Sequence, residues 1–289
     1  EGKRTYAMAS VLYDVQNKIA IDSQLAPAHA YEVNLAIAHL AHTQEKDLVV
    51  ADRGYASYRF LATLSKQKRG FVIRCSAGSF GVAQRMLKGE GAASQIVTLH
   101  APVDQKKTIL ESELPEAIQV RFVRIMLKTG EYEVLVTSLL DEASYSLEDL
   151  AEIYGLRWGI ESFYGVLKTR LGLENFSGQS AESVRQDFYA SVYLTGLETI
   201  LTADANAELS EKDVLHPQKV NHAVSFNAIK NEAFALLGGK ERADVVLQKL
   251  ERLFLMNPTC QRSERDIPRQ KRSDNHLLNY QKRSRKICF

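Results

Sequence analysis

The first 75 residues of the chain alternate between continuous apolar runs, which suit β-strands, and apolar residues at helical spacing. Residues 48–51 form a short continuous apolar run, which is typical of a buried strand. The helix predicted after this strand starts at Ser57, a common N-cap residue, and ends with cationic residues just before Gly70. In chain order, we expect strands over 5–13, 18–27, 48–51 and 70–75 and helices over 31–43 and 57–69.

The rest of the chain changes character twice. Residues 76–137 contain short β-like runs separated by glycine-rich or charged turns, whereas helical periodicity returns at Ser146 and stops at Gly172. The residues from Ser146 to Asp149 have the form of a capping box. This alternation predicts an α/β fold with some parallel strands. Its expected parts are a core over 1–75 and 138–200, a β-rich insertion over 76–137, a C-terminal helical region over 201–260 and a basic tail over 261–289.

Length and composition are those of an ordinary globular protein. The chain has 289 residues, of which 45% are hydrophobic, so it can bury a substantial core. No apolar run approaches the roughly 18 residues that a membrane helix needs, and no hydrophobic signal region opens the chain. We therefore expect a cytoplasmic protein with no membrane partner. Cys75, Cys260 and Cys288 are far apart, which argues against a disulfide framework and a zinc site.

The formal net charge of +2 hides an uneven distribution along the chain. Residues 261–289 contain nine Lys or Arg residues and three acidic residues, so this tail carries +6 and the rest of the chain carries −4. A basic tail on an acidic body suggests a polyanionic partner, although a solvated terminus would have the same composition.

The most informative segment is residues 154–168, where polar side chains recur at helical spacing. At 100° per residue, Tyr154, Arg157, Glu161 and Lys168 fall within an arc of about 60°. A second arc, about 110° away, holds apolar residues and is expected to face the core. The apolar arc consists of Ile160, Phe163, Leu167 and Leu171. One helix is thus predicted to pack by one face and to present a carboxylate among cations on another.

Glu161 between two cations suits the joint binding of a metal ion and phosphate groups. The carboxylate would hold a hard cation, and the cations would hold the anionic phosphate groups. By spacing alone, an ordinary solvated ion pair is the better explanation, because Arg157 and Glu161 are four residues apart on the predicted helix. Gly155 and Gly159 favour the functional interpretation modestly, since each costs a helix about 1 kcal/mol relative to alanine and hints at close approach by a large group.

Asp52 is the second candidate for this chemistry. It follows a predicted buried strand, and open α/β sheets bind ligands at the carboxyl ends of their strands. An isolated Asp-Arg-Gly turn would be weak evidence, because Asp and Gly are common turn residues. Asp52 becomes informative because it occurs together with Glu161.

The polar stripe has the spacing Tyr-x2-Arg-x3-Glu-x6-Lys, which resembles the YREK signature of DDE transposases of the insertion-sequence-four type. The run DLVVADRGY, which contains Asp52, is similar to the family block that holds the second catalytic aspartate. The run LENFSGQSAESVRQDFYA is similar to the block after the signature, and the resemblance spans residues 5–200. Four positions in order, preceded by an aspartate-bearing strand, are a specific signal that outweighs the simple ion-pair explanation.

The resemblance implies an RNase H-like catalytic core interrupted by the β-rich insertion, and metal-dependent strand cleavage and strand transfer at insertion-sequence ends. Two Mg²⁺ ions, which Mn²⁺ can replace, clamp the scissile phosphate in such enzymes. One ion lowers the pKa of the attacking water, and the other stabilises the leaving oxygen. The implied roles are catalytic metal binding for Asp52 and Glu161, and DNA phosphate binding for Tyr154, Arg157 and Lys168, with Arg53 as a further DNA contact.

The chain departs from the family pattern in one respect. The family needs three carboxylates, and its first aspartate usually lies in a DGT or DGS block upstream of the segment that matches residues 5–13. No such block is present and the chain begins at Glu1, so we expect this aspartate to lie upstream and the fragment alone to be inactive. Asp14 and Asp22 are the nearest acids, but both match turn or strand positions of the family.

Two other functions fit part of the pattern. An RNase H-like nuclease would share the metal carboxylates but would have no use for the spaced Tyr, Arg and Lys. A non-catalytic, DNA-binding transposase remnant would use the basic tail and the cationic helix without metal chemistry.

Trp158 could contact DNA bases, but we expect it to fill the core. The expected partner is double-stranded DNA, as transposon ends and target, and synapsis of two ends favours a homodimer over a monomer.

Overall fold

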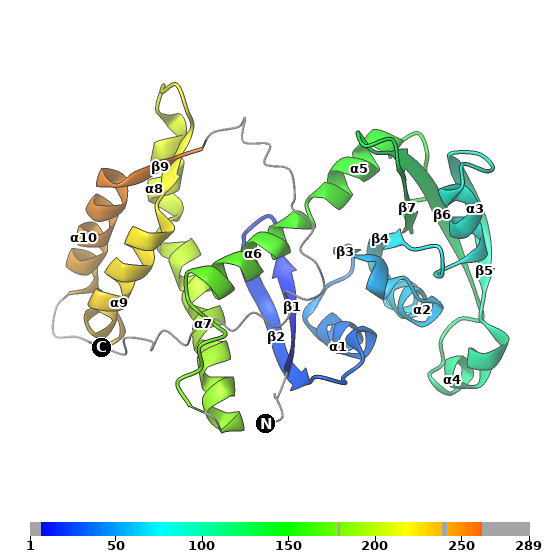
Figure 1. Ribbon diagram of the computed structural model, residues 1–289, viewed down its shortest axis with the longest axis horizontal. Coiled ribbons are helices and arrows are strands. Elements are labelled where there is room, and N and C mark those ends of the chain that lie inside the picture. The colour runs from blue at the N-terminus through cyan, green and yellow to red at the C-terminus, as the bar shows by residue number, and fades with distance from the viewer. Residues whose placement is uncertain (1–6, 179, 239–241, 262–289) are drawn as a thin grey trace. The chain divides into compact units, whose positions relative to one another are not determined.

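A computed structural model describes residues 7–178, 180–238 and 242–261 (Figure 1). Its contacts divide the chain into two units, Glu1–Ser162 and Phe163–Phe289. No helix in the described ranges is long and apolar enough to cross a membrane. The strands are β1 (Ala7–Asp14), β2 (Ile19–Pro27), β3 (Leu48–Ala51), β4 (Gly70–Cys75), β5 (Ser94–His100), β6 (Ala117–Met126), β7 (Tyr132–Thr137), β8 (Gln218–Val220) and β9 (Pro258–Cys260). The α-helices are α1 (Glu32–His39), α2 (Tyr58–Lys66), α3 (Gly81–Leu87), α4 (Lys106–Glu111), α5 (Leu147–Gly155), α6 (Trp158–Thr169), α7 (Ala181–Leu201), α8 (Ala203–Glu211), α9 (His222–Gly238) and α10 (Ala243–Met256).

The first unit is built on a mixed five-stranded sheet with the strand order β3-β4-β7-β6-β5 (Figure 1). β3 and β4 are parallel, and all other neighbours in this sheet are antiparallel. The parallel pair confirms the predicted α/β layer, because parallel neighbours need a crossover connection, which α2 provides here. β1 and β2 form the predicted antiparallel hairpin, which is a separate two-stranded sheet.

The segment 76–137, predicted as a β-rich insertion, has no sheet of its own. Its strands β5, β6 and β7 extend the sheet that begins with β3 and β4, because β7 pairs with residues 72–75 of β4. The segment also contains α3 and α4, which the pattern did not predict. These helices have seven and six residues, too few for helical periodicity to stand out from β-like runs.

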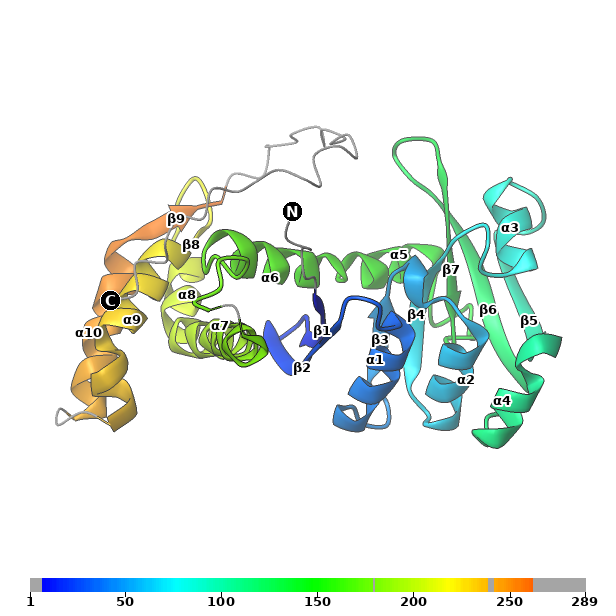
Figure 2. The same ribbon diagram turned by 60° about the horizontal axis from the view of Figure 1, so that its bottom comes forward.

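Side chains that alternate along β4 bury both faces of the sheet. Phe71 and Ile73 belong to a core that also contains residues of α1, α2, α3 and α4, whereas Val72 belongs to a second core with α5. All three residues are fully buried. Figure 2 shows α1 and α2 on one side of the sheet and α5 on the other. The continuous apolar run of β4 is therefore that of a strand covered on both faces.

The second unit is helical, as the periodicity after residue 183 predicts. Helices α8, α9 and α10 bury an apolar cluster, to which partly buried residues of α7 are packed. The short strands β8 and β9 pair antiparallel beside this cluster. The buried residues of the cluster are Ala205, Leu209, Val220, Ala228, Ile229, Val246, Leu250 and Phe254. The predicted basic tail lies outside the described residues, apart from Gln261.

Two serines precede helices of the first unit, but only one of them caps its helix. Ser146 begins α5 with the predicted capping box: its Oγ accepts a hydrogen bond from the Asp149 N–H at 3.1 Å, and the Asp149 carboxylate accepts one from the Ser146 N–H at 2.8 Å. Ser57 precedes α2 without a side-chain cap bond, and its hydroxyl is buried without a partner among the described residues.

Replacing Ser146 by alanine should lower the free energy of unfolding of the first unit by about 1 kcal/mol, because an orphan helix N–H loses its acceptor. Ser57→Ala is the matched control, and it should cause no loss, because the buried hydroxyl makes no bond. Urea denaturation followed by circular dichroism measures both. Equal losses in the two variants would contradict the capping role of Ser146.

Candidate active site

Asp52 directly follows β3, at the carboxyl end of the strand, as the sequence predicts. Its carboxylate accepts a hydrogen bond from the Gly54 N–H at 2.9 Å, which holds a short 3-10 turn over Arg53–Tyr55. Asp52 and Arg53 are both exposed. The turn therefore presents one carboxylate and one guanidinium to the solvent, in a position where a ligand can reach them.

A second carboxylate lies beside this turn. Glu32 is in the first turn of α1, and a Cβ placed on Gly54 would lie 3.2 Å from Glu32 Oε2 and 3.2 Å from Asp52 Oδ1. Any side chain at position 54 would therefore crowd both carboxylates. Nothing in the local sequence marks Glu32, because only the folding of α1 against the 3-10 turn brings it near Asp52.

The signature region is not the single helix that its periodicity predicts. Two residues separate α5 from α6, and this turn is held by bonds between residues three apart, such as Arg157 N–H to Tyr154 O at 3.1 Å. Gly155, the last residue of α5, disfavours continuation of the helix. Tyr154 therefore lies on α5, whereas Glu161 and Lys168 lie on α6. The prediction that all four signature residues share one continuous helix is wrong.

Tyr154 is a buried residue of the core between α5 and the sheet, where it packs with Val72, Leu135 and Leu150. Only 5% of it is exposed, and its hydroxyl has no hydrogen-bond partner among the described residues. Burial raises the pKa of the Tyr154 phenol, and the positive charge of Arg157 offsets this effect only in part. Tyr154 thus packs in the core, while its predicted contact with a DNA phosphate stays a prediction.

Arg157 and Glu161 form the expected ion pair, with Nη1 and Oε1 2.8 Å apart. The guanidinium also lies 5.0 Å from the ring centroid of Trp158 and 5.5 Å from that of Tyr154. Burial lowers the pKa of Arg157, but the hydrogen-bonded Glu161 carboxylate outweighs this effect and raises the pKa overall. The side chain of Arg157 is 12% exposed and that of Glu161 is 39% exposed. The pair is therefore partly shielded, with the carboxylate on the solvent side.

Trp158 is exposed over 52% of its surface, so the expectation that it fills the core is wrong. Phe163 and Leu167 are the buried residues of α6, as predicted, and they leave Trp158 at the surface beside Arg157. A Cβ at Gly159 would lie 3.4 Å from Cγ1 of Val15, in the turn of the β1–β2 hairpin. At Gly159 the neighbouring group is thus this hairpin, at ordinary van der Waals distance. A Cβ at Gly155 would meet no described atom within 4 Å, so the close approach expected there is wrong.

Lys168 lies on α6 beyond the boundary between the two units. Its Nζ is 3.5 Å from Glu174 Oε1, and both side chains are more than half exposed. Because Lys168 follows Glu161 by seven residues, the two lie on the same side of α6. Because both side chains are exposed to solvent, the ion pair with Glu174 is weak, and Lys168 can exchange this partner for another.

The donor chemistry of Asp52 and Glu161 suits Mg²⁺, which prefers carboxylate oxygens. Over the described ranges, however, no group of three His, Cys, Asp or Glu side chains is arranged to share a metal ion. The described chain therefore supplies carboxylates of the right kind but not a complete metal site.

Asp14 and Asp22, the acids nearest to the expected first aspartate, have other partners. Asp14 accepts hydrogen bonds from the backbone N–H groups of Gln16 and Asn17 in the hairpin turn. Asp22 Oδ2 lies 2.6 Å from His39 Nδ1. Burial alone would raise the pKa of Asp22, but its hydrogen bonds, first that with His39, lower it. Both acids thus serve the hairpin.

His39 also lies 3.0 Å from the hydroxyl of Ser10 through Nε2, so it links Ser10 with Asp22. A Ser-His-Asp relay can serve nucleophilic catalysis. Here Ser10 is 8% exposed and His39 is 4% exposed, which denies a substrate access to the hydroxyl. The relay instead ties α1 to both strands of the hairpin, a tertiary role that the sequence did not reveal.

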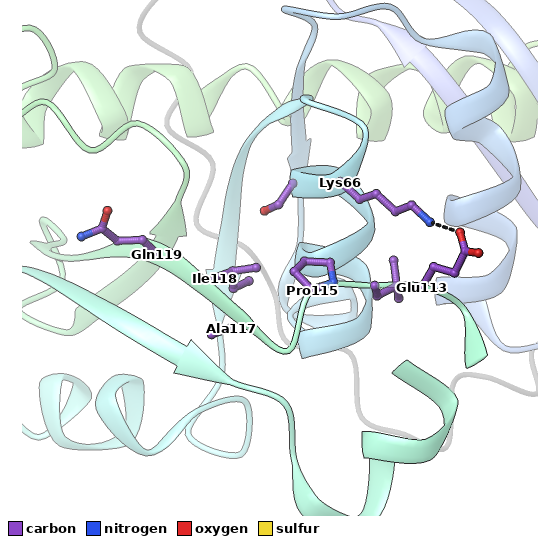
Figure 3. Close-up of a pocket in the computed structure, with 8 residues that line it drawn as sticks. Lys66, Glu113, Pro115, Ala117, Ile118 and Gln119 are labelled. Atoms are coloured by element: carbon purple, nitrogen blue, oxygen red, sulfur yellow. Dashed lines mark hydrogen bonds and ion pairs between the residues drawn. The ribbon is translucent and has the colours of Figure 1, made fainter. Parts of the chain in front are cut away.

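An open pocket of about 560 Å³ lies between the end of α2 and the start of β6 (Figure 3). Its ionisable side chains, Lys66 and Glu113, are 3.4 Å apart and neutralise each other. None of the predicted site residues lines this pocket. It is therefore no candidate for the predicted chemistry.

Comparison with known proteins identifies the class. Residues 1–194 match the family model of the transposase DDE domain. A cryo-EM structure of the piggyBac transposase synaptic complex with hairpin DNA resembles the chain, with a TM-score of 0.51 and 9% sequence identity. The match covers 95% of this chain and 57% of that one, so this chain spans little more than half of that protein. No curated protein sequence matches.

The chain thus shares its mixed α/β fold with a solved transposase. The chain belongs to the transposase DDE domain family, whose members are phosphoryl-transfer enzymes of DNA transposition.

Tyr154→Phe should leave the free energy of unfolding unchanged or raise it, because an unpaired buried hydroxyl costs about 1–3 kcal/mol. The matched control is Tyr58→Phe, since the Tyr58 hydroxyl is buried but donates to Pro115 O at 2.9 Å. That variant should lose about 1 kcal/mol. Chemical denaturation of both variants measures the difference, and a larger loss for Tyr154→Phe would mean that its hydroxyl is bonded.

Proposed function

We propose that the protein is a DNA transposase of the insertion-sequence-four type, which cleaves and transfers DNA strands at insertion-sequence ends. The observation that carries this proposal is the partly buried Arg157–Glu161 pair at the start of α6, in a chain of the DDE family. The parallel pair β3–β4, with Asp52 at its carboxyl end, supports an RNase H-like core. The β-strands after β4 are the segment that interrupts this core.

Asp52 and Glu161 are the residues that would hold two Mg²⁺ ions, or Mn²⁺ in their place. When bound, these ions would activate the attacking water and stabilise the leaving oxygen. A further carboxylate, from outside the described residues, would complete the site.

Arg157 has two roles in this proposal. Without DNA, its guanidinium neutralises Glu161 at 2.8 Å. A DNA phosphate can replace that carboxylate, because guanidinium binds both groups through the same paired N–H donors. The exchange would leave the Glu161 carboxylate free. Binding of the DNA backbone and exposure of the catalytic carboxylate are thus coupled through one side chain.

The proposed DNA contacts are Arg157, Lys168, Arg53 and Tyr154, on double-stranded transposon ends and target DNA. The exposed ion pair of Lys168 with Glu174 can open at little cost, whereas Tyr154 would need a rearrangement to expose its hydroxyl. Synapsis of two ends favours a homodimer, and a protein that acts on bacterial DNA would work in the cytoplasm.

A non-catalytic DNA-binding remnant is the second candidate function. It is favoured by one observation, the absence of three grouped metal ligands from the part of the chain that the structure covers. An RNase H-like nuclease has less support, because it would not need the spaced Arg157 and Lys168.

Metal binding separates the transposase from the remnant. Fe²⁺ in place of Mg²⁺, with ascorbate and peroxide, produces radicals that cut the polypeptide near the bound ion. We expect cuts next to Asp52 and Glu161 in the presence of duplex DNA, and their loss in Asp52→Asn and in Glu161→Gln. Glu174→Gln is the matched control and should cut normally. DNA binding without any such cuts would favour the remnant.

DNA binding tests the cationic residues. Arg157→Gln and Lys168→Gln should each weaken duplex binding and reduce the salt dependence, the slope of log K against log salt, by about 1. Lys107→Gln, which removes an exposed cation of α4, is the control and should change neither quantity. Fluorescence anisotropy across a salt series measures the slopes. Unchanged slopes in Arg157→Gln and Lys168→Gln would remove these residues from the DNA interface.

A further inference from the structure

Helix α7 has apolar residues on a buried face and on an exposed face about 100° away. Its inner face includes Phe188 and Val192, which are 1% and 9% exposed. Its outer face carries Tyr189, Tyr193 and Ile200, which are 45%, 61% and 63% exposed. A surface helix normally has a polar outer face, and a helix that is apolar all round is normally buried. The outer face of α7 is therefore expected to have a partner.

The outer apolar positions follow a regular spacing. Tyr189, Tyr193, Gly196 and Ile200, which we call the α7 stripe, are separated by four, three and four residues, as in the contact seam of a coiled coil. The only charged residue from Phe188 to Leu201 is Glu198, which is buried on the other face. An uncharged stripe offers nothing to a DNA phosphate. Its chemistry fits another apolar helix.

We propose that the α7 stripe binds the α7 stripe of a second copy of this chain, antiparallel, around a two-fold axis between Leu194 and Thr195. In this register Tyr193 faces Gly196 of the other copy, and Tyr189 faces Ile200. A Cβ added to Gly196 would find no atom of the described residues within 4 Å, so this position is an open hole for the Tyr193 ring. The stripe is thus complementary to itself, as a two-fold interface requires.

A parallel pair would fit less well. It would set Gly196 against Gly196, which leaves a gap, and Tyr193 against Tyr193, which crowds the same layer. Only the antiparallel pair places Tyr193 against Gly196, the one small residue of the stripe.

The charges beyond the stripe support the same direction. Arg185 lies at its amino-terminal end, 57% exposed and 3.6 Å from Glu182, so it can take a second partner. Asp204 lies beyond the other end, exposed in the first turn of α8. Antiparallel pairing brings the end that carries Arg185 to the end that carries Asp204 of the other copy.

The proposed function includes a homodimer, and this interface would be its contact surface. The inference rests on the proposed function in this one respect. It uses no residue of the candidate active site, and association is measured without DNA or metal. Failure of the catalytic proposal and failure of this interface are therefore distinguishable.

Sedimentation equilibrium of the full chain tests the association. We expect a monomer–dimer equilibrium whose dissociation constant rises at least about tenfold in Tyr193→Lys. Gly196→Leu should have the same effect, because leucine fills the hole on the dimer side but meets open space within the monomer. Phe234→Lys is the matched control, an aromatic residue of α9 with 85% exposure, and it should leave association unchanged. Far-UV circular dichroism verifies that each variant is folded.

Cysteine cross-linking tests the direction, in a background with Cys260 and Cys288 replaced by serine. A mixture of Tyr193→Cys and Gly196→Cys chains should form disulfide-linked dimers, whereas Tyr193→Cys alone should not. Cross-linking of Tyr193→Cys to itself would overturn the antiparallel arrangement. A chain that stays monomeric would overturn the interface. Nitration of Tyr193 would then show whether another part of the same chain covers the stripe, and either result leaves the interface overturned. A dimer that Tyr193→Lys leaves intact would overturn it as well.

Discussion

The burial of β4 on both of its faces is the constraint on which the first unit depends. Phe71, Val72 and Ile73 are all fully buried, so helices must cover the sheet from two sides. β3 is held as the parallel neighbour of this strand, and Asp52 follows β3 directly. The Val72 face holds α5, whose last turn leads to Arg157 and α6. Both halves of the candidate site are thus anchored to one strand.

The Arg157–Glu161 pair is strong enough to order the site but weak enough to exchange. An i,i+4 pair on a helix contributes about 0.2–0.5 kcal/mol. Each cation–π contact at a partly exposed site contributes about 0.5–1 kcal/mol more. Exchange breaks only the ion pair, whose contribution is far below the cost of about 3–5 kcal/mol for breaking a fully buried pair. A phosphate can therefore displace Glu161 from Arg157 without disrupting the fold, and the remaining contacts with the aromatic rings can keep the guanidinium in place.

Those parts of the fold that rest on local patterns could be predicted from the sequence. β3 and β4 are continuous apolar runs, and the cap of α5 is a local motif at Ser146. The two strands and the capping box were therefore predicted correctly. The two-residue break after Gly155 was missed because the hydrophobic period continues across it in the sequence.

Glu32 near Asp52, and His39 between Ser10 and Asp22, could not be predicted, because each contact joins elements that are distant along the chain. At 100° per residue, Trp158 lies about 180° from the centre of the apolar arc, so its exposure agrees with the helical periodicity.

Trp158 is the only tryptophan of the chain, and it stands half exposed against the guanidinium of Arg157. Indole emission responds to nearby charge and to solvent. The Trp158 indole is therefore an intrinsic fluorescent probe. Its surroundings would change when Arg157 exchanges Glu161 for a phosphate. Events at the start of α6 can be followed in unlabelled protein, with no other indole to obscure the signal.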